Sequence, residues 1–292
     1  MICCTYVMFG GITVKQNKRL LALLVILMAA GLLFAQTTNS GTLKLTGAYG
    51  TGIEAKLDAA YQAKIPVLAG EGPLFSGNNV KVKANLGLSP IAGTVTLDAV
   101  LTPIAVAEIS LGGGLGTGWD FDLMDLEGVK LGTPLVSDSL NGLYYLGRAG
   151  AAFQFDTGAI FSGDWMSVVI RTYHELNYKG YSNASSGQAW EYENGGVMVN
   201  GFNYKGEYIL GYQMPLMVNL VGLQLETYSF NVFDDATDMV GDLSLIANTQ
   251  FTEDLSLLTA IQFTNYSKDD NRVITKGDAA FKRIALILTY AL

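Results

Sequence analysis

The final residues of the chain, 281 to 292, constrain the fold more than any other stretch. Large apolar residues occupy every second position, namely Ile284, Leu286, Leu288, Tyr290 and Leu292. The positions between them are Arg283, Ala285, Ile287, Thr289 and Ala291. Successive side chains of a β-strand point to opposite faces, so the segment predicts a strand with one oily face. Such a strand needs a neighbour for its backbone. We expect the first strand of a closed barrel, Leu43 to Tyr49; the alternative is an edge strand of a soluble sheet.

The composition agrees with many short apolar elements. Apolar residues make up 50% of the chain and charged residues only 15%, whereas soluble domains carry roughly 25% charge. The longest apolar run, Leu20 to Ala35, falls short of the roughly 20 residues of a spanning helix. The counts of 34 glycines and 15 tyrosines against six prolines favour strands, turns and interfacial aromatics.

Residues 1–35 have the layout of a secretory leader. Lys15 to Arg19 form a basic segment, an apolar segment follows, and Ala35 ends a small-residue cleavage site. The alternative is an uncleaved anchor. Residues 1–13 precede the basic segment and indicate a misassigned start. We therefore expect a leader at 1–35, a short segment at 36–41 and a barrel at 42–292.

Charge and cysteine content exclude several classes of protein. The net charge is −8, and removing the three basic residues of the leader, which has no acid, leaves −11. Nucleic acid would need a basic surface, so we expect no such partner. The only cysteines, Cys3 and Cys4, precede the apolar segment. We expect no disulfide, no lipid-anchoring cysteine near Ala35, and no cofactor.

Apolar and polar residues alternate with a period of two through much of the chain after residue 41. This alternation predicts an all-β, closed antiparallel transmembrane barrel of about 12 strands, with 10 as the alternative. The count depends on whether Gly50 to Gly52 is a turn or a kink, and on whether Thr102-Pro103 is a turn or a bulge. We prefer twelve, because merged strands would exceed the roughly 9 to 11 residues of a membrane crossing. Gly112 to Gly147 is expected to be one long connection.

Connection lengths in the second half alternate between short and long. Outer-membrane barrels have short periplasmic turns and longer extracellular loops. With the C-terminus in the periplasm, the loops around Leu126, Ser185, Asp235 and Asp270 would lie outside the cell. The long Pro66 to Asn79 segment would then be an unusual periplasmic turn.

Two segments carry a resemblance to a known family. Gly116 to Asp120 (GTGWD) and Tyr208 to Leu216 (YILGYQMPL) resemble the outer-membrane β-barrel proteins of spirochaetes. The terminal strand resembles the C-terminal assembly signal of bacterial barrels, with Leu292 where that family usually has Phe. The resemblance implies an outer-membrane location, with Tyr290 and Leu292 as the assembly signal. Its implied partners are membrane lipid and the barrel-assembly machinery.

Charged residues of the polar parity are expected to line the lumen. They lead us to expect a narrow porin or small-molecule transport channel, with a small solute as ligand. The alternative is a non-conducting barrel whose surface loops bind host or envelope partners. The candidate lining residues are Glu54, Lys56, Asp58, Asp98, Glu108, Arg148, Arg171, Glu175, Lys205, Glu207, Asp242 and Arg283, with Lys81 and Lys83 on the same face.

The opposite parity carries the expected interface aromatics, which are Trp165, Tyr178, Tyr204, Tyr208, Tyr212 and Tyr290. His174, the only histidine, falls on this parity. A lipase-like pairing of His174 with Ser182, Ser185 or Ser186 is a third hypothesis, but no residue is indicated to orient the histidine, and we expect no enzyme.

One histidine and no cysteine after the leader argue against a zinc site, and we expect no metal. Asp120, Asp122, Asp125 and Glu127 supply the oxygens that Ca²⁺ prefers, but without the spacing of an EF-hand loop. A solvated acidic loop is the expectation.

The leader prediction is tested by sequencing the N-terminus of protein purified from membranes. We expect it to begin at or close to Gln36, because signal peptidase cleaves after small residues such as Ala35. A purified chain that retains Leu20 to Phe34 would contradict cleavage and favour the uncleaved anchor.

Overall fold

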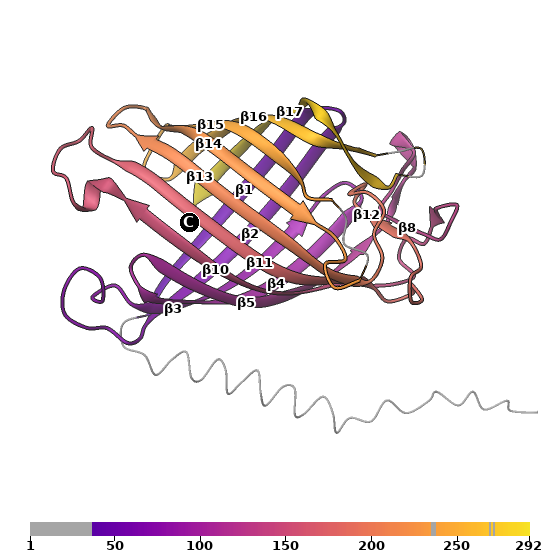
Figure 1. Cartoon of the computed structure of the whole chain (residues 1–292), viewed down its shortest axis with the longest axis horizontal. Helices are drawn as coiled ribbons and strands as arrows, with labels where there is room; N and C mark the ends of the chain where they lie inside the picture. Colours follow the sequence, from indigo (N-terminus) through magenta and orange to yellow (C-terminus); the bar gives the residue numbers. More distant parts are fainter. Residues whose placement is uncertain (1–36, 235–237, 269, 271) are drawn as a thin grey trace, which may run out of the picture. The chain divides into compact units, whose positions relative to one another are not determined.

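The computed structural model describes residues 37–234, 238–268, 270 and 272–292. Twelve antiparallel strands close into a barrel (Figure 1), in the order β1-β17-β16-β15-β14-β13-β11-β10-β5-β4-β3-β2. The predicted leader, 1–35, lies outside the described residues. The strands of the barrel are β1 Thr38–Gly50, β2 Ile53–Pro66, β3 Asn79–Leu88, β4 Ala92–Ile104, β5 Ala107–Gly118, β10 Tyr144–Asp156, β11 Val168–Tyr181, β13 Gly201–Gln213, β14 Val218–Ser229, β15 Val240–Gln250, β16 Leu255–Lys268 and β17 Ile274–Ala291.

The barrel has apolar side chains outside and polar side chains inside. Leu45, Leu97 and Leu111 leave 55%, 60% and 67% of their surface exposed, whereas Glu175 and Asp242 are buried. This is the reverse of a soluble domain, and it follows from the alternation of the strands. Within the described residues, no helix has the length and apolarity needed to cross a bilayer.

The first and last strands of the barrel close the ring. Leu43 pairs with Tyr290 and Tyr49 pairs with Ile284, in an unbroken antiparallel ladder. The Leu292 amide donates to the Gly41 carbonyl at 2.9 Å. The predicted pairing of the terminal strand with the Leu43 to Tyr49 strand is therefore confirmed.

The twelve-strand count is confirmed, and the turn at Gly50 to Gly52 decides it. The Gly50 amide donates to the Gly52 carbonyl at 3.0 Å, and β1 and β2 pair as a tight hairpin. A Cβ on Gly50 would lie 2.1 Å from the carbonyl oxygen of Lys282 on β17. Only glycine allows the three strands to approach so closely at this corner.

Several predicted boundaries were wrong. The first strand begins at Thr38, inside the expected 36–41 segment, and the terminal strand begins at Ile274 and not at 281. The expected connection from Gly112 to Gly147 is partly strand, since β5 continues to Gly118 and β10 begins at Tyr144. Five of the twelve residues of β5 are glycines, four of them at every second position from Gly112 to Gly118, and the stretch looked like a loop because glycines carry no side chains. Thr102-Pro103 is not a turn, because β4 continues through an irregularity between Leu101 and Ile104, and the chain reverses at 105–106.

A further boundary concerns β11. The strand begins at Val168 instead of Trp165, because the residues before Val168 form hydrogen-bonded turns. Asp156 caps a short 3-10 helix, η2 Thr157–Ala159, by accepting from the Gly158 amide at 2.8 Å. The connection 157–167 is therefore longer than the turn expected at Phe161 to Asp164.

The two ends of the barrel differ. The end that carries Thr38 and Leu292, here called the terminal end, has the connections 67–78, 105–106, 157–167, 214–217 and 251–254. The opposite end, here called the loop end, carries further short elements (Figure 1). These are β6 Asp120–Phe121, the 3-10 helix η1 Asp122–Met124, β7 Leu126–Glu127, β8 Val129–Leu131, β9 Val136–Ser137 and β12 Trp190–Tyr192. β12, β8 and β9 form one small sheet.

The closing seam gives a test of assembly. Tyr290 pairs with Leu43 on one side and Leu255 on the other, so replacing both Tyr290 and Leu292 with Ser removes the large apolar residues at the end of the seam. We expect the variant to lose the compact, heat-modifiable band on a gel.

The matched control is Thr289→Ser with Ala291→Ser, which changes the other face of the same strand by small steps. It should assemble normally. Normal insertion of the Tyr290 and Leu292 variant would count against the seam as the closing element.

Candidate lumen site and its cap

The charged side chains inside the barrel pair with one another along the wall. Arg148 donates two hydrogen bonds to Asp98, at 2.6 and 2.7 Å. Further pairs join Lys81 to Glu108 at 2.5 Å, Lys205 to Glu226 at 2.7 Å, Lys282 to Asp242 at 2.6 Å, Arg171 to Glu207, and Arg283 to Glu54. The charges of the inner wall are thus mostly joined in pairs, and two members of these pairs, Glu226 and Lys282, were not among the expected lining residues.

One pair shows how the backbone makes room for a charged contact. Asp98 lies on β4 and Arg148 on β10, with β5 between these two strands. Gly112 of β5 pairs with both residues. A Cβ on Gly112 would lie 1.9 Å from Asp98 Oδ1. Glycine at this inward position therefore allows the carboxylate and the guanidinium to meet over the intervening strand.

The alternation of apolar and polar residues in the sequence did not predict that Lys282, next to Arg283, faces the lumen. The pairing of β16 with β17 shifts register between Gln262 and Phe263, which leaves Lys282 as the extra residue of a bulge. Lys282 donates to Asp242 at 2.6 Å and Arg283 to Gln262 at 2.8 Å. Two consecutive cations thus reach polar partners of the inner wall.

The other expected lining residues have weaker or neutral partners. Lys56 lies 3.7 Å from Glu193, and Asp58 accepts from Asn85 at 3.2 Å. Glu175 accepts from Tyr173 Oη at 2.7 Å and from Asn177 at 2.9 Å.

A folded cap, defined as residues 119–143 and 182–200, stands at the loop end. Its core holds Trp190, which has no exposed surface, with Val129, Tyr181 and Tyr192 packed around it. Tyr144 of β10 stacks on Tyr192 with ring centroids 4.5 Å apart. The cap is therefore a packed structure whose apolar core it shares with the ends of the barrel strands.

The cap is anchored at well-separated points of the ring. Tyr192 Oη donates to the Gly93 carbonyl at 3.1 Å, at the start of β4. Glu193 approaches Lys56 of β2, which stands five places from β11 in the ring of twelve. Since residues 182–200 leave from the end of β11, these contacts carry them across the mouth of the barrel.

A buried ion pair holds the cap on a further side. Glu191 has 1% of its surface exposed and accepts two hydrogen bonds from Arg272, both at 2.5 Å. These hydrogen bonds to the Glu191 carboxylate raise the pKa of Arg272, outweighing partial burial, so the guanidinium stays charged. Lys268 also donates to the Asn194 carbonyl.

Asp138 joins the two parts of the cap to the barrel. Its carboxylate accepts from Tyr181 Oη at 2.6 Å, Asn183 at 3.0 Å and Asn141 at 3.1 Å. Partial burial opposes ionisation, but the three donors together hold the pKa of Asp138 below its usual value. The carboxylate remains an acceptor well into the acidic range.

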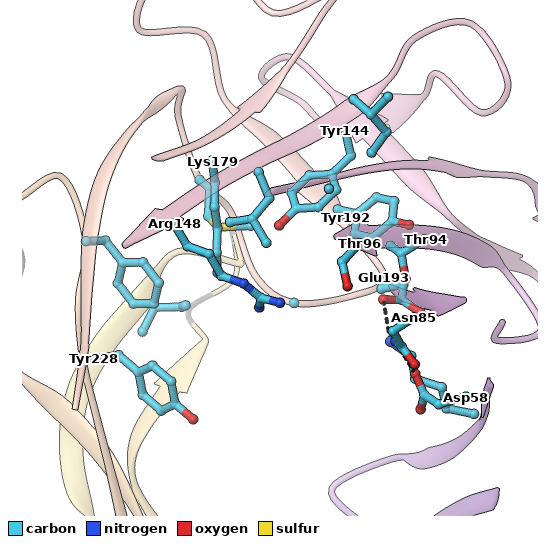
Figure 2. A pocket seen from close by; sticks show the side chains of 18 of the residues that line it. Asp58, Asn85, Thr94, Thr96, Tyr144, Arg148, Lys179, Tyr192, Glu193 and Tyr228 are labelled. Carbon is cyan, nitrogen blue, oxygen red and sulfur yellow. Dashed lines mark hydrogen bonds and ion pairs between the residues drawn. The ribbon is translucent and has the colours of Figure 1, made fainter. Parts of the chain in front are cut away.

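Beneath the cap the lumen opens into a chamber of about 510 Å³. Figure 2 shows Arg148 extending into this space, with Asp58, Asn85 and Glu193 on the opposite side. Strands from most of the ring and residues of the cap contribute to the walls. The polar and charged lining residues are Lys56, Asp58, Asn85, Thr94, Thr96, Tyr144, Arg148, Lys179, Tyr192, Glu193, Tyr228 and Tyr266.

Reasoning from sequence missed the cap and its contribution to the chamber. Gly180 to Gly196 looked like a polar loop, although Trp190 and Tyr192 alternate within it and Val129 and Leu131 do the same in the preceding connection. These short alternating segments could have indicated the cap, because apolar residues at every second position predict strands that bury one face. Glu226, Tyr228 and Lys179 were also missed.

The outer wall carries the expected interface aromatics. Tyr212 Oη donates to the Trp165 carbonyl at 2.9 Å near the terminal end, where Tyr290 is also exposed. Tyr178 contacts Phe202 edge to face near the loop end, with centroids 5.0 Å apart. Tyr204 and Tyr208 lie further along β13 and contact His174.

His174 lies on the outer wall. Its Nδ1 is 2.7 Å from Tyr204 Oη. In the part of the chain that the structure describes, no hydrogen bond joins His174 to Ser182, Ser185 or Ser186. The hydroxyl of Ser182 accepts a hydrogen bond from the Leu143 amide at 2.9 Å.

The acidic segment at Asp120 has protein donors. Asp120 accepts from Ser137 at 2.9 Å and from Ser139 at 2.5 Å. The described residues contain no group of three or more His, Cys, Asp and Glu side chains arranged to hold a metal ion. These contacts fit a hydrogen-bonded loop.

Comparisons with known proteins find similarity in structure but not in sequence. No family model and no curated protein matches the chain. Among solved structures, the NanC porin shows 8% identity and a TM-score of 0.42, covering 85% of this chain and 98% of its own. OmpT of Vibrio cholerae shows 9% identity, a TM-score of 0.39 and coverages of 88% and 97%.

A third similar structure is OmpF of Salmonella typhi, with 10% identity, a TM-score of 0.33 and coverages of 88% and 97%. At such low identities and TM-scores, these likenesses carry no inference about function. Function must therefore be inferred from the geometry of the lumen and the cap.

The Glu191 to Arg272 pair gives a test of the cap. Replacing Arg272 with Met leaves a buried carboxylate without its cation, which destabilises the local structure strongly. We expect chymotrypsin to cut at Trp190 or Tyr192 at least about tenfold faster in the folded variant, because the cap opens more often.

The matched control is Lys130→Met, which removes an ion pair with Glu127 at 3.4 Å whose carboxylate is 38% exposed. Exposed pairs contribute little, so cleavage should change by less than about twofold. Equal cleavage of the two variants would show that Glu191 and Arg272 do not hold the cap.

Proposed function

We propose that this chain is an outer-membrane β-barrel that forms a narrow channel for small solutes. The observation that carries the proposal is the chamber of about 510 Å³, which lies within a closed barrel and is lined by charged and phenolic side chains. An apolar outer wall around a polar lumen suits a barrel in lipid, because closure leaves no edge and every strand can hydrogen-bond to a neighbour.

In this proposal the terminal end of the barrel lies in the periplasm. A terminal end in the periplasm puts the cap at the cell surface, and the predicted cleavage near Ala35 suits export through the inner membrane. The partners in this account are membrane lipid, the barrel-assembly machinery and a small solute. The segments GTGWD and YILGYQMPL carry the resemblance to spirochaete barrels, and Tyr290 and Leu292 act as the assembly signal.

The strand number and the ion pairs support a narrow channel. Barrels of about eight strands are filled by their own side chains, whereas about sixteen leave an open channel. Twelve strands lie between these limits. Pairs such as Arg171 with Glu207 occupy part of the remaining lumen, and mixed charges at a constriction select among ions by sign.

The packed cap favours a second candidate, a non-conducting barrel whose surface residues bind a partner. Trp190 and Glu191 are buried, so the segment across the mouth is held in place. In that case the ion pairs would serve as a filled interior. Conductance separates the two candidates.

We expect purified, refolded protein to give discrete current steps in a planar bilayer. Arg171→Ala should leave Glu207 without its cation and shift the reversal potential in a salt gradient toward cation selectivity. Glu207→Gln, the complementary change, should shift the reversal potential toward anion selectivity, because Arg171 then stays unpaired.

Opposite shifts from the two variants would place the pair in the conducting path. Absence of current steps from protein that migrates as a folded barrel would favour the second candidate. Current steps that neither variant alters would place the conducting path elsewhere.

A further inference from the structure

Lys179 differs from the other cations of the chamber. It lines the chamber but forms no ion pair with any residue that the structure describes. The other two cations of the chamber have acidic neighbours, since Arg148 binds Asp98 and Lys56 lies 3.7 Å from Glu193. Lys179 is thus the basic side chain of the chamber that forms no ion pair with a described acid.

The acid nearest to Lys179 along its strand is occupied. Glu175 accepts from Tyr173 Oη at 2.7 Å and from Asn177 at 2.9 Å. Both donors come from the same inner face of β11. Glu175 is thereby held by neutral partners, and no hydrogen bond joins the Lys179 amine to a residue that the structure describes.

The walls around Lys179 are apolar and aromatic. Leu146 pairs with Lys179 across the strands, and Met198, Tyr228 and Phe230 line the same chamber. Figure 2 shows Lys179, Arg148 and Tyr228 on one side of the space. A basic side chain among apolar walls is matched by a molecule that has one negative charge and an apolar body.

The opposite side of the chamber restricts the charge of the ligand. Asp58 and Glu193 line that side, and Asp58 has only the neutral Asn85 as its hydrogen-bond partner among the described residues. A second negative charge on the ligand would approach these carboxylates. The arrangement therefore favours a single anionic group at one end of the molecule.

We propose that the chamber binds small organic monoanions, namely carboxylates with a compact apolar or aromatic body, with Lys179 as the partner of the carboxylate. This rests on the proposed channel function and names its solute class. A cavity of about 510 Å³ has the size of a small-ligand site. The cap forms part of the binding site through Tyr192, Glu193 and Met198.

The test uses benzoate as the anionic probe and benzamide as a neutral probe of nearly the same shape. In a planar bilayer, benzoate should block the current through the wild-type channel at concentrations where benzamide has no effect. Lys179→Met keeps the length of the side chain and removes its charge. It should raise the half-blocking concentration of benzoate by about tenfold or more.

Lys83→Met is the matched control. Lys83 lies on the same polar parity and forms no ion pair with a described residue, but it does not line the chamber. This variant should keep the wild-type response to benzoate. Both variants are first checked for the heat-modifiable band of a folded barrel.

The outcomes separate the inference from the proposed channel. Current steps without benzoate block, equal block by benzamide, or an equal loss of block in the Lys83 variant would each overturn the binding inference and leave the channel intact. Saturable, Lys179-dependent quenching of tyrosine fluorescence by benzoate, in protein that gives no current, would support the binding site and contradict the channel.

Discussion

The pairing of β1 with β17 is the constraint on which the rest of the structure depends. A strand has a full set of backbone partners only when both of its edges are paired, and closure provides this for every strand of the ring. The pairing between β1 and β17, which includes Leu43 with Tyr290 and Tyr49 with Ile284, closes the ring of strands. Once the ring is closed, alternation assigns each side chain to the outer wall or to the lumen.

Closure also concentrates charge in a confined lumen, and small departures from regular strands arrange that charge. Gly112 allows Asp98 and Arg148 to meet across an intervening strand, and the bulge at Lys282 brings two consecutive cations to polar partners. Most charges of the wall are neutralised within the wall itself. Among the described acidic and basic residues that line the chamber beneath the cap, Lys179 and Asp58 form no ion pair. Lys179 is the basic one of the two, so binding of an anionic ligand is expected to depend on that residue.

The fold was predictable from the sequence to a large extent, whereas the site was not. Period-two alternation depends only on local geometry, so it identified the barrel, the twelve strands and the closing seam. The alternation failed to predict the extent of β5, because the inward positions of that strand from Gly112 to Gly118 hold glycines, which have no side chain. It also failed at Lys282, because the bulge there interrupts the alternation of inward and outward residues. The cap depends on contacts such as Glu191 with Arg272, which are far apart in sequence and have no local signature.

The central claim is that small solutes, but not large ones, reach a chamber beneath a packed cap. Cysteine occurs only at positions 3 and 4, so Thr96→Cys places a single thiol in the chamber of a chain cleaved after Ala35. The direct measurement is the labelling rate of this thiol in folded protein. A small methanethiosulfonate should react readily and a large polyethylene-glycol maleimide should not. Equal labelling by both reagents, or by neither, would contradict the claim.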